Sequence, residues 1–242
     1  MSGMRETDGE RARRLGSKVC YEIYIRSFND SNGDGVGDLK GITERLDYLE
    51  RLGVDYLWIT PFFVSPLKDG GYDVADYCAV DPVFGTMDDF CELVREAEKR
   101  NIYLMLDMVF NHTSDQHEWF QKALAGDARY QDYYLMQDAE AGATADNPGK
   151  APSNWDSKFG GPAWEYVPAL NKWYLHLYDV SQPDLNWRNP ELRTELAKVL
   201  ASGRTRGSGA FALTLSTTSP SPRPTRTTSK VTAGGSTPTG RT

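Results

Sequence analysis

The stretch I-Y-L-M-L-D-M-V-F at residues 102–110 decides the fold class of this chain. It is almost continuously apolar, as strands are when helices cover both faces of a parallel sheet. Two further candidate strands precede it, at residues 19–27 and 54–60, and apolar residues at helical spacing predict helices at residues 39–52 and 88–100. This alternation of strands and helices predicts an α/β fold with a parallel sheet.

The alternation stops after this third strand. Residues 112–180 are rich in aromatic residues and in Gly, Asn and Pro, and they show no helix–strand rhythm. Because the stretch is too long for an ordinary connection between a strand and a helix, we expect an inserted subdomain there. The regular pattern returns at residues 181–200, where Asn189 is the expected N-cap of a helix at residues 191–200.

The composition narrows the class of protein. The chain has 242 residues, of which 39% are hydrophobic and 12% aromatic, enough for a substantial core. The net charge of −7 argues against nucleic-acid binding, and no run approaches the roughly 20 apolar residues of a membrane span. The polar residues 1–18 lack the apolar run of a secretory signal. The three cysteines have no metal-binding spacing, so we expect a reducing, cytoplasmic location.

Residues 30–38 (D-S-N-G-D-G-V-G-D) are a candidate metal site, because oxygen-bearing side chains recur at alternate positions as in a calcium loop. The expected ligands are the side chains of Asp30, Asn32, Asp34 and Asp38 and the carbonyl of Val36. A solvated turn is the alternative, since Asn, Asp and Gly also favour turns. We favour a structural Ca²⁺ without an EF-hand, because the twelfth loop position is Gly41 rather than Glu.

A second candidate site, D-G-G-Y-D at residues 69–73, follows the strand at residues 54–60. Loops after the carboxyl ends of parallel strands are where α/β enzymes place their sites. Asp69 is able to accept hydrogen bonds from sugar hydroxyls while Tyr72 stacks on a pyranose ring, which is the chemistry of a carbohydrate subsite. Taken by itself, the pattern favours a surface turn with a packing tyrosine.

The third candidate site, D-M-V-F-N-H-T-S at residues 107–114, ends the third strand. Asp107 lies in an apolar run, where burial demands hydrogen-bond partners. His112 lies where the strand opens into a loop, so we expect it to reach a ligand. His117 and His176 are expected to be structural.

Together these segments resemble the α-amylase superfamily of glycoside hydrolases over about residues 19–200. The resemblance rests on Y-E-I-Y-I-R-S-F, W-I-T-P-F, D-G-G-Y-D-V-A-D-Y, D-M-V-F-N-H-T-S and Q-P-D-L-N-W in combination. The form Q-P-D-L-N is similar to the branch that contains oligo-1,6-glucosidases, sucrose isomerases and trehalose-6-phosphate hydrolases. S-K-F-G-G-P-A-W looks closest to the last of these.

The resemblance implies the N-terminal part of a (β/α)8 TIM barrel, with its first strands and helices in residues 19–111. It implies a domain B inserted after strand 3, at residues 112–180, and a return to the barrel at residues 181–200. It also implies that Asp69, Tyr72 and His112 contact the sugar, and that the substrate is an α-glucoside or a phosphorylated disaccharide.

The catalytic residues that the resemblance implies do not occur in this chain. The resemblance implies a retaining mechanism with an Asp nucleophile, a Glu acid/base and a second Asp. None of these three is found in this chain, so we expect no catalysis by it and an uncovered edge on its third strand. Isomerisation or transglycosylation by the same chemistry, and a sugar-binding module without catalysis, stay open as alternatives.

Residues 201–242 differ in kind from the rest of the chain. They contain six Lys or Arg and no Asp or Glu, whereas residues 1–200 contain 21 basic and 34 acidic side chains. We expect this low-complexity tail to be disordered. Codons for F-A-L-T-L-S at residues 211–216, when read two bases later, can give R-F-D-V-V, the family's nucleophile strand. We interpret the tail as a shifted reading frame, with a natural basic tail as the alternative.

Overall fold

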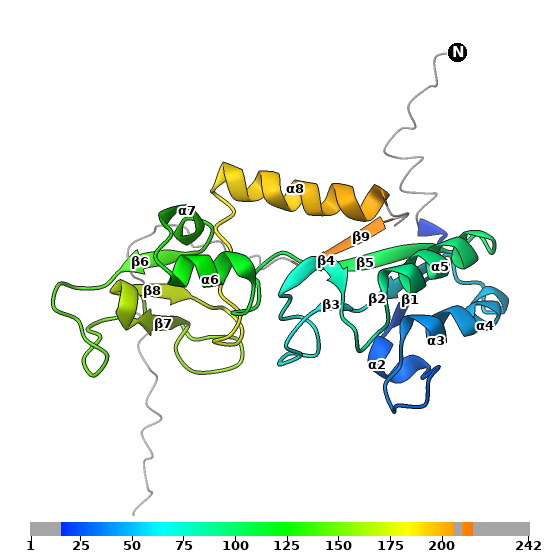
Figure 1. Cartoon of the computed structure of the whole chain (residues 1–242), viewed down its shortest axis with the longest axis horizontal. Helices are drawn as coiled ribbons and strands as arrows, with labels where there is room; N and C mark the ends of the chain where they lie inside the picture. Colours follow the sequence, from blue (N-terminus) through cyan, green and yellow to red (C-terminus); the bar gives the residue numbers. More distant parts are fainter. Residues whose placement is uncertain (1–15, 206–209, 215–242) are drawn as a thin grey trace, which may run out of the picture.

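A computed structural model describes residues 16–205 and 210–214, which form two parts lying side by side beneath one long helix (Figure 1). One part is built on a parallel sheet with the strand order β1-β2-β5-β9. Its strands are β1 (Cys20–Ile23), β2 (Tyr56–Ile59), β5 (Tyr103–Val109) and β9 (Ala210–Thr214). This is the α/β architecture that the apolar run at residues 102–110 predicts.

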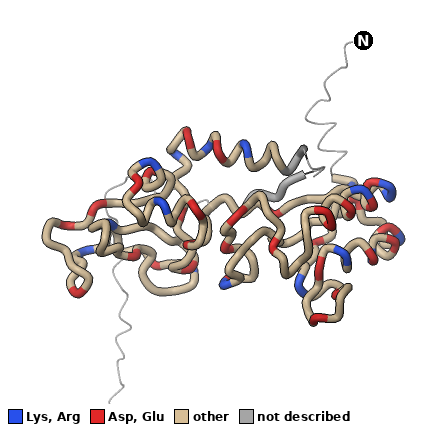
Figure 2. Tube along the Cα trace, in the orientation of Figure 1, with Lys and Arg blue, Asp and Glu red and all other residues tan. Residues whose placement is uncertain are grey.

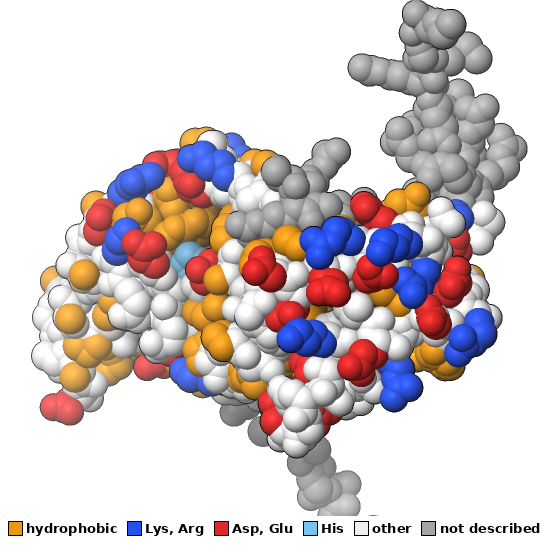
Figure 3. All heavy atoms as spheres, turned by 45° about the vertical axis from the view of Figure 1, so that its right-hand side comes forward, with side chains coloured by type: hydrophobic (Ala, Val, Ile, Leu, Met, Phe, Trp, Pro, Cys, Tyr) orange, Lys and Arg blue, Asp and Glu red, His pale blue; other side chains and the backbone are white. Residues whose placement is uncertain are grey.

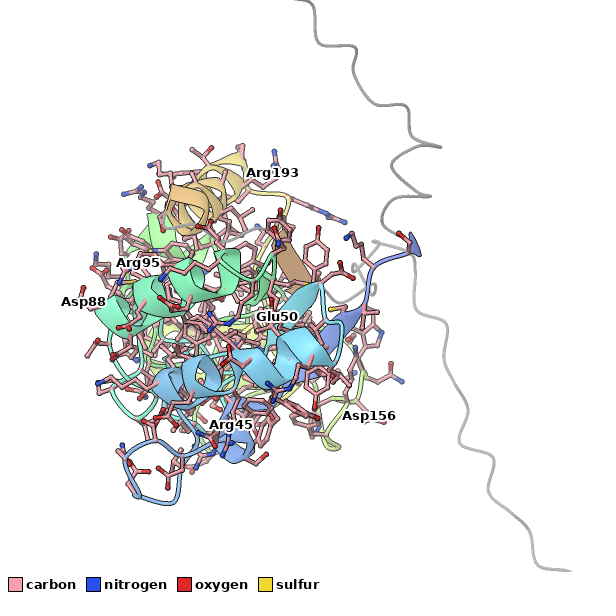
Figure 4. The ribbon with its side chains drawn as sticks, turned by 90° about the vertical axis from the view of Figure 1, so that its right-hand side faces the viewer. Arg45, Glu50, Asp88, Arg95, Asp156 and Arg193 are labelled. Carbon is pink, nitrogen blue, oxygen red and sulfur yellow. The ribbon has the colours of Figure 1, made fainter. Side chains whose placement is uncertain are left out.

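Helices cover one face of this sheet. They are α3 (Leu39–Glu44), α4 (Leu46–Arg51), α5 (Met87–Glu98) and the long α8 (Pro190–Thr205). Figure 4 looks onto α3, α4 and α5, whose apolar sides pack inward while Glu50, Asp88 and Arg95 lie on the exposed side. Acidic and basic residues are interspersed along these exposed sides (Figure 2). The core beneath them is apolar, with Leu57, Leu93 and other residues fully buried.

The first strand and the first helix are shorter than predicted. The strand β1 ends at Ile23, and the chain turns into the short helix α2 (Ile25–Phe28), because the Ile25 amide donates to Thr60 Oγ1 (3.3 Å) instead of continuing a ladder. The predicted helix at residues 39–52 is divided into α3 and α4 at Arg45. Apolar spacing does not register this break, since Leu46 and Leu49 continue the buried face.

Residues 112–180 contain regular structure that the sequence did not reveal. Two helices, α6 (Glu118–Leu124) and α7 (Ala128–Gln131), precede an antiparallel sheet with the strand order β6-β8-β7. Its strands are β6 (Met136–Asp138), β7 (Trp164–Val167) and β8 (Lys172–Leu175), with a single 3-10 turn (Pro168–Leu170) between the last two. A small apolar cluster that includes Trp164, Trp173 and Leu175 forms a second core here. Short strands separated by long loops leave no periodic signal in the sequence.

The expectation of a disordered tail does not hold at two places. The helix α8 begins after Asn189, whose side chain accepts from the amide of Glu191 (2.8 Å) as an N-cap, but it runs on to Thr205. The strand β9 pairs in parallel with β5, which otherwise has a free edge on that side. Unpaired main-chain groups at a sheet edge pair readily with another extended segment, because the pairing uses main-chain groups and not particular side chains. Residues 206–209 and 215–242 lie outside the described residues, so the rest of the tail interpretation stays a prediction.

Within the described ranges, none of the helices combines the length and apolar character needed to cross a bilayer. A two-stranded antiparallel ribbon, β3 (Phe63–Val64) with β4 (Asp76–Val80), extends beyond β2 and frames the loop that carries Asp69.

We predict that Gly41→Ala destabilises the protein, although alanine normally favours a helix over glycine. A Cβ at Gly41 would lie 1.9 Å from the carbonyl oxygen of Asn29, so the loop before α3 must move. We expect a loss of about 2 kcal/mol or more, typical of overpacking, as a lower midpoint in thermal unfolding. Gly16→Ala is the matched control, because nothing lies within 4 Å of its added Cβ. Equal midpoints for the two variants would contradict this packing.

Candidate functional site

A buried aspartate shapes the loop that carries Asp69. Asp73 is fully buried and accepts hydrogen bonds from Ser65 Oγ (2.9 Å) and from the amides of Lys68 (2.9 Å) and Asp69 (3.1 Å). Gly71 adopts φ 106°, and a Cβ there would lie 2.8 Å from the carbonyl oxygen of Pro61. The sequence D-G-G-Y-D therefore specifies one tight turn, more than the surface turn that the pattern alone suggests.

This turn places Asp69 against a residue far along the chain. Asp69 Oδ2 accepts a hydrogen bond of 2.8 Å from Nε2 of Gln182. Partial burial raises the pKa of the Asp69 carboxyl, with a smaller contribution from the charges of Asp73 and Asp179, while the bond from Gln182 opposes the rise. The result is a fixed carboxylate with a second oxygen that is able to meet a ligand.

Tyr72 is held by a carboxylate on the sheet. Its hydroxyl donates to Asp107 Oδ2 (3.1 Å), the same oxygen that accepts from the indole nitrogen of Trp58 (3.2 Å). Asp107 is 1% exposed, and these two donors supply the partners that its burial demands. Burial together with the charge of Asp107 raises the pKa of Tyr72, so the phenol stays protonated at neutral pH.

His112 lies beside this turn as a neutral ring. Its Nε2 donates to the carbonyl oxygen of Tyr72 (3.1 Å), and its Nδ1 accepts from Nδ2 of Asn111 (3.0 Å). That pair of bonds is satisfied by the neutral Nε2–H tautomer. Burial lowers the pKa of His112 to about 4. The structure thus brings Asp69, Tyr72 and His112 together, joined by the Tyr72–His112 contact.

Asp184 connects the end of β5 to the antiparallel part of the chain. Its Oδ1 accepts from Asn111 Nδ2 (3.2 Å) and from the amide of Leu177 (3.0 Å), and the residue is 3% exposed. Burial raises the pKa of this carboxyl to about 7, against the opposing effect of these two bonds. Asp184 also forms an isolated antiparallel bridge with His112.

Two residues of this site were not among the sequence predictions. Gln182 contacts Asp69, and the Tyr178 ring lies 5.1 Å from the His112 ring, centroid to centroid. Tyr178 also carries the ammonium group of Lys158 over its ring, at 4.6 Å. The only available signal was the motif Q-P-D-L-N-W itself, because Gln182 lies 113 positions after Asp69 in the sequence.

The predicted structural histidines have structural contacts. His117 caps α6, because its Nδ1 accepts from the amide of Trp119 (3.1 Å). His176 is buried and its Nδ1 bonds the carbonyl oxygen of Tyr178 (3.2 Å).

The predicted calcium loop is an exposed turn held by its own main chain. Asp30 accepts from the amides of Gly33 (2.7 Å) and Gly35 (2.8 Å), and Asp34 accepts from the amide of Val36 (2.8 Å). Asp38 is buried and has another role as the N-cap of α3, accepting from the amide of Gly41 (2.6 Å). In the part of the chain that the structure describes, no three His, Cys, Asp or Glu side chains gather as a metal site. The oxygen donors suit Ca²⁺ in type, whereas this arrangement does not present them as a cage.

We predict that Asp184→Asn changes how stability depends on pH. A carboxyl whose pKa rises from 3.8 to about 7 on folding stabilises the fold below pH 4 and loses that contribution as the pH rises toward 7. Asparagine keeps the Oδ1 acceptor and does not titrate. The unfolding midpoint of the wild type should therefore fall relative to that of the variant between about pH 4 and pH 7, by roughly 2–4 °C for each kcal/mol that is lost. The exposed Asp146→Asn is the control. Parallel midpoint curves for wild type and Asp184→Asn would refute the assignment.

Comparison with known proteins places this arrangement in context. The family model described as alpha amylase, catalytic domain, matches residues 22–207. The trehalose-6-phosphate hydrolase of Escherichia coli is 51% identical over 189 residues, which are 78% of this chain and 33% of that protein. The oligo-1,6-glucosidase of Bacillus cereus is 44% identical over 81% of this chain and 34% of its own length. The chain thus spans about a third of the length of these relatives.

Solved structures of proteins of the same kind superpose on this chain. The trehalose-6-phosphate hydrolase of Bacillus licheniformis superposes with a TM-score of 0.76 at 44% identity, covering 81% of this chain and 34% of that one. A mutant of MutB in complex with the substrate sucrose gives a TM-score of 0.76 at 47% identity, covering 82% of this chain and 34% of its own. These relatives are TIM-barrel glycoside hydrolases. The similarity confirms the expectation that this chain is the N-terminal part of a (β/α)8 barrel. The chain belongs to the α-amylase catalytic-domain family of glycoside hydrolases.

Proposed function

We propose that Asp69, Tyr72, His112 and Gln182 bind the glucosyl unit of an α-glucoside, and that the activity of the whole protein is α-glucoside hydrolysis. The observation that carries this is the Asp69–Gln182 hydrogen bond of 2.8 Å. It fixes a partly buried carboxylate beside an aromatic ring and a neutral imidazole, so that one side of a sugar meets a hydrogen-bond acceptor and a flat apolar surface. The trehalose-6-phosphate hydrolase of E. coli and the oligo-1,6-glucosidase of B. cereus, both named for the hydrolysis of glucosides, support the same interpretation.

The substrate we favour is a phosphorylated disaccharide such as trehalose 6-phosphate, because the E. coli relative of that name is 51% identical. Oligo-1,6-glucosidase activity is the second candidate, supported by the B. cereus relative. The retaining mechanism needs two carboxyl groups about 5–5.5 Å apart at the scissile bond. The carboxylates described here are already hydrogen-bonded in binding and positioning roles, so we propose that this chain binds without cleaving.

The location we propose is the cytoplasm. All three cysteines lie in the described part of the chain, and they form no disulfide there. A reducing compartment is consistent with exposed thiols at Cys20 and Cys78.

Sugar binding has a direct test. Asp69→Asn removes charge-assisted hydrogen bonds to sugar hydroxyls, worth about 1.5–3 kcal/mol for a charged acceptor. We expect the Kd for methyl α-D-glucopyranoside, measured by NMR titration, to rise at least about 10-fold, since tenfold corresponds to 1.4 kcal/mol. Glu98→Gln on the exposed side of α5 is the control and should bind as the wild type does. Unchanged binding in Asp69→Asn, or no binding by the wild type, would contradict the proposal.

We also propose that the loop at residues 30–38 binds Ca²⁺, through the exposed Asp30, Asn32 and Asp34 and the Val36 carbonyl. The support is the oxygen-donor spacing and the exposure of the loop, with Asp38 left to cap α3. Because the present turn does not hold its oxygen donors as a cage, Asp30, Asn32, Asp34 and Val36 would have to rearrange around the ion on binding.

Calcium binding predicts a stability gain. At free Ca²⁺ about 100-fold above Kd, unfolding should cost about 2.7 kcal/mol more than in EDTA, seen as a higher unfolding midpoint. Asp34→Asn should abolish the gain, while Asp146→Asn, a distant exposed acid, should keep it. A midpoint that does not respond to Ca²⁺ in the wild type would leave the solvated turn as the correct interpretation.

A further inference from the structure

The loop between α2 and α3 contains a reactive sequence that the proposed functions do not use. Asn32 is the one asparagine of this chain that is followed by a glycine, Gly33. Residues 32–35 are exposed, and the loop protrudes from the sheet-containing part (Figure 1), where polar and acidic atoms form the surface (Figure 3). Among the described residues, nothing lies within 4 Å of a Cβ built on Gly33, so no neighbour crowds the main chain there.

An Asn–Gly sequence is prone to a reaction within the chain. The amide nitrogen of the glycine attacks Cγ of the asparagine, so that a new N–Cγ bond forms, the Cγ–Nδ2 bond breaks, and ammonia leaves with the proton that the amide loses. Water then opens the five-membered imide at either carbonyl, which yields aspartate or isoaspartate. Glycine favours the attack because it has no Cβ to hinder its nitrogen. Asparagine is accordingly among the thermolabile residues that heat-stable proteins avoid.

In this loop a carboxylate holds the attacking nitrogen. Oδ1 of Asp30 accepts a hydrogen bond from the amide of Gly33 (2.7 Å), and its Oδ2 accepts one from the amide of Gly35 (2.8 Å). Gly35 follows Asp34, and an Asp–Gly sequence undergoes the same ring closure with loss of water. One side chain therefore binds the reactive nitrogens of both sequences, and we call this pair of bonds the Asp30 clamp.

The Asn32 side chain is engaged with Asp34 instead of Gly33. Its Oδ1 accepts from the amide of Asp34 (2.9 Å), and its Nδ2 donates to Oδ2 of the same residue (3.0 Å). Ring closure removes Nδ2 and moves Cγ onto the Gly33 nitrogen, so both contacts resist it. The reacting groups are thus each bound to a partner other than one another.

Charge acts in the same direction. The amide nitrogen becomes a strong nucleophile when it loses its proton, and a negative charge on Gly33 would lie beside the Asp30 carboxylate, which like-charge repulsion disfavours. The amide bonds from Gly35 and Gly33 lower the pKa of Asp30, so this carboxylate stays ionised at neutral pH. Because the clamp is exposed and water competes for each hydrogen bond, we expect its effect on the reaction to be moderate in size.

We propose that Asn32 is a latent modification site, and that the Asp30 clamp restrains its conversion to aspartate and isoaspartate. The product adds a negative charge to the loop and, as isoaspartate, an extra main-chain methylene before α3. This inference goes beyond the proposed function and depends neither on sugar binding nor on Ca²⁺ binding.

The test follows Asn32 in the full chain during incubation at neutral pH. Mass spectrometry of the digested protein measures the fraction of Asn32 that has exchanged its amide for an acid. We expect Asp30→Ala to convert roughly 3- to 10-fold faster than the wild type, which is the factor that one net hydrogen bond represents. EDTA in the buffer keeps the measurement independent of Ca²⁺.

Ser31→Ala is the matched control. The Ser31 hydroxyl donates to Oδ2 of Asp38 (2.8 Å), so this variant removes a hydrogen bond of the same loop and leaves the Asp30 clamp in place. Its conversion rate should equal that of the wild type. Equal acceleration in Ser31→Ala and Asp30→Ala would mean that general loosening of the loop sets the rate, and would overturn the proposal.

A second comparison uses the unchanged sequence. In denaturant the clamp is lost, so Asn32 of the wild type should convert at least about as fast as it does in native Asp30→Ala. Equal rates for native and denatured wild type would contradict the proposal, as would a lack of acceleration in Asp30→Ala. Slower conversion in Asp30→Ala would show that the carboxylate acts as a base that promotes the reaction, and would overturn the restraining role.

Discussion

The carboxylate of Asp184 is the constraint on which the site depends. Its Oδ1 receives one hydrogen bond from Asn111, at the end of β5, and one from the amide of Leu177, just after β8. It therefore joins the parallel sheet to the antiparallel part at a buried point. Leaving either donor unsatisfied there would cost about 1–3 kcal/mol. Because Gln182 lies two residues earlier in the same segment, the joint also determines where Gln182 meets Asp69.

The same joint sets the chemistry of His112. Asn111 has two amide hydrogens, and it donates to both Asp184 and Nδ1 of His112. The imidazole is thereby held as the neutral Nε2–H tautomer, and its one N–H donates to the carbonyl oxygen of Tyr72. Asp107 performs the corresponding role for the Tyr72 ring. A sugar that enters this site meets side chains already oriented, so little ordering is required on binding.

The sequence was most informative where a single segment carries its own signal. The strand at residues 103–109 and the helix at residues 87–98 follow directly from apolar runs and spacing. The sequence did not predict the division of the first helix at Arg45, because the buried apolar face continues across it. Nor did it predict the antiparallel sheet of residues 136–175, which depends on hydrogen bonds between distant segments. Gln182 was missed for the same reason. Asp69, Tyr72 and His112 were found as candidates because each follows a strand of the sheet. The strand β9 was not predicted, because residues 210–214 lie in the segment that was expected to be disordered.

A double-mutant cycle on the Asn111–Asp184 pair tests whether this buried hydrogen bond couples the two parts of the chain. The unfolding free energies of Asn111→Ala, Asp184→Ala and the double variant would be measured by denaturant titration. We expect a coupling energy of at least about 1 kcal/mol, as residues in one buried network show. Losses that add to within about 0.3–0.5 kcal/mol would mean that the two side chains act independently and that Asp184 is not the joint between the two parts.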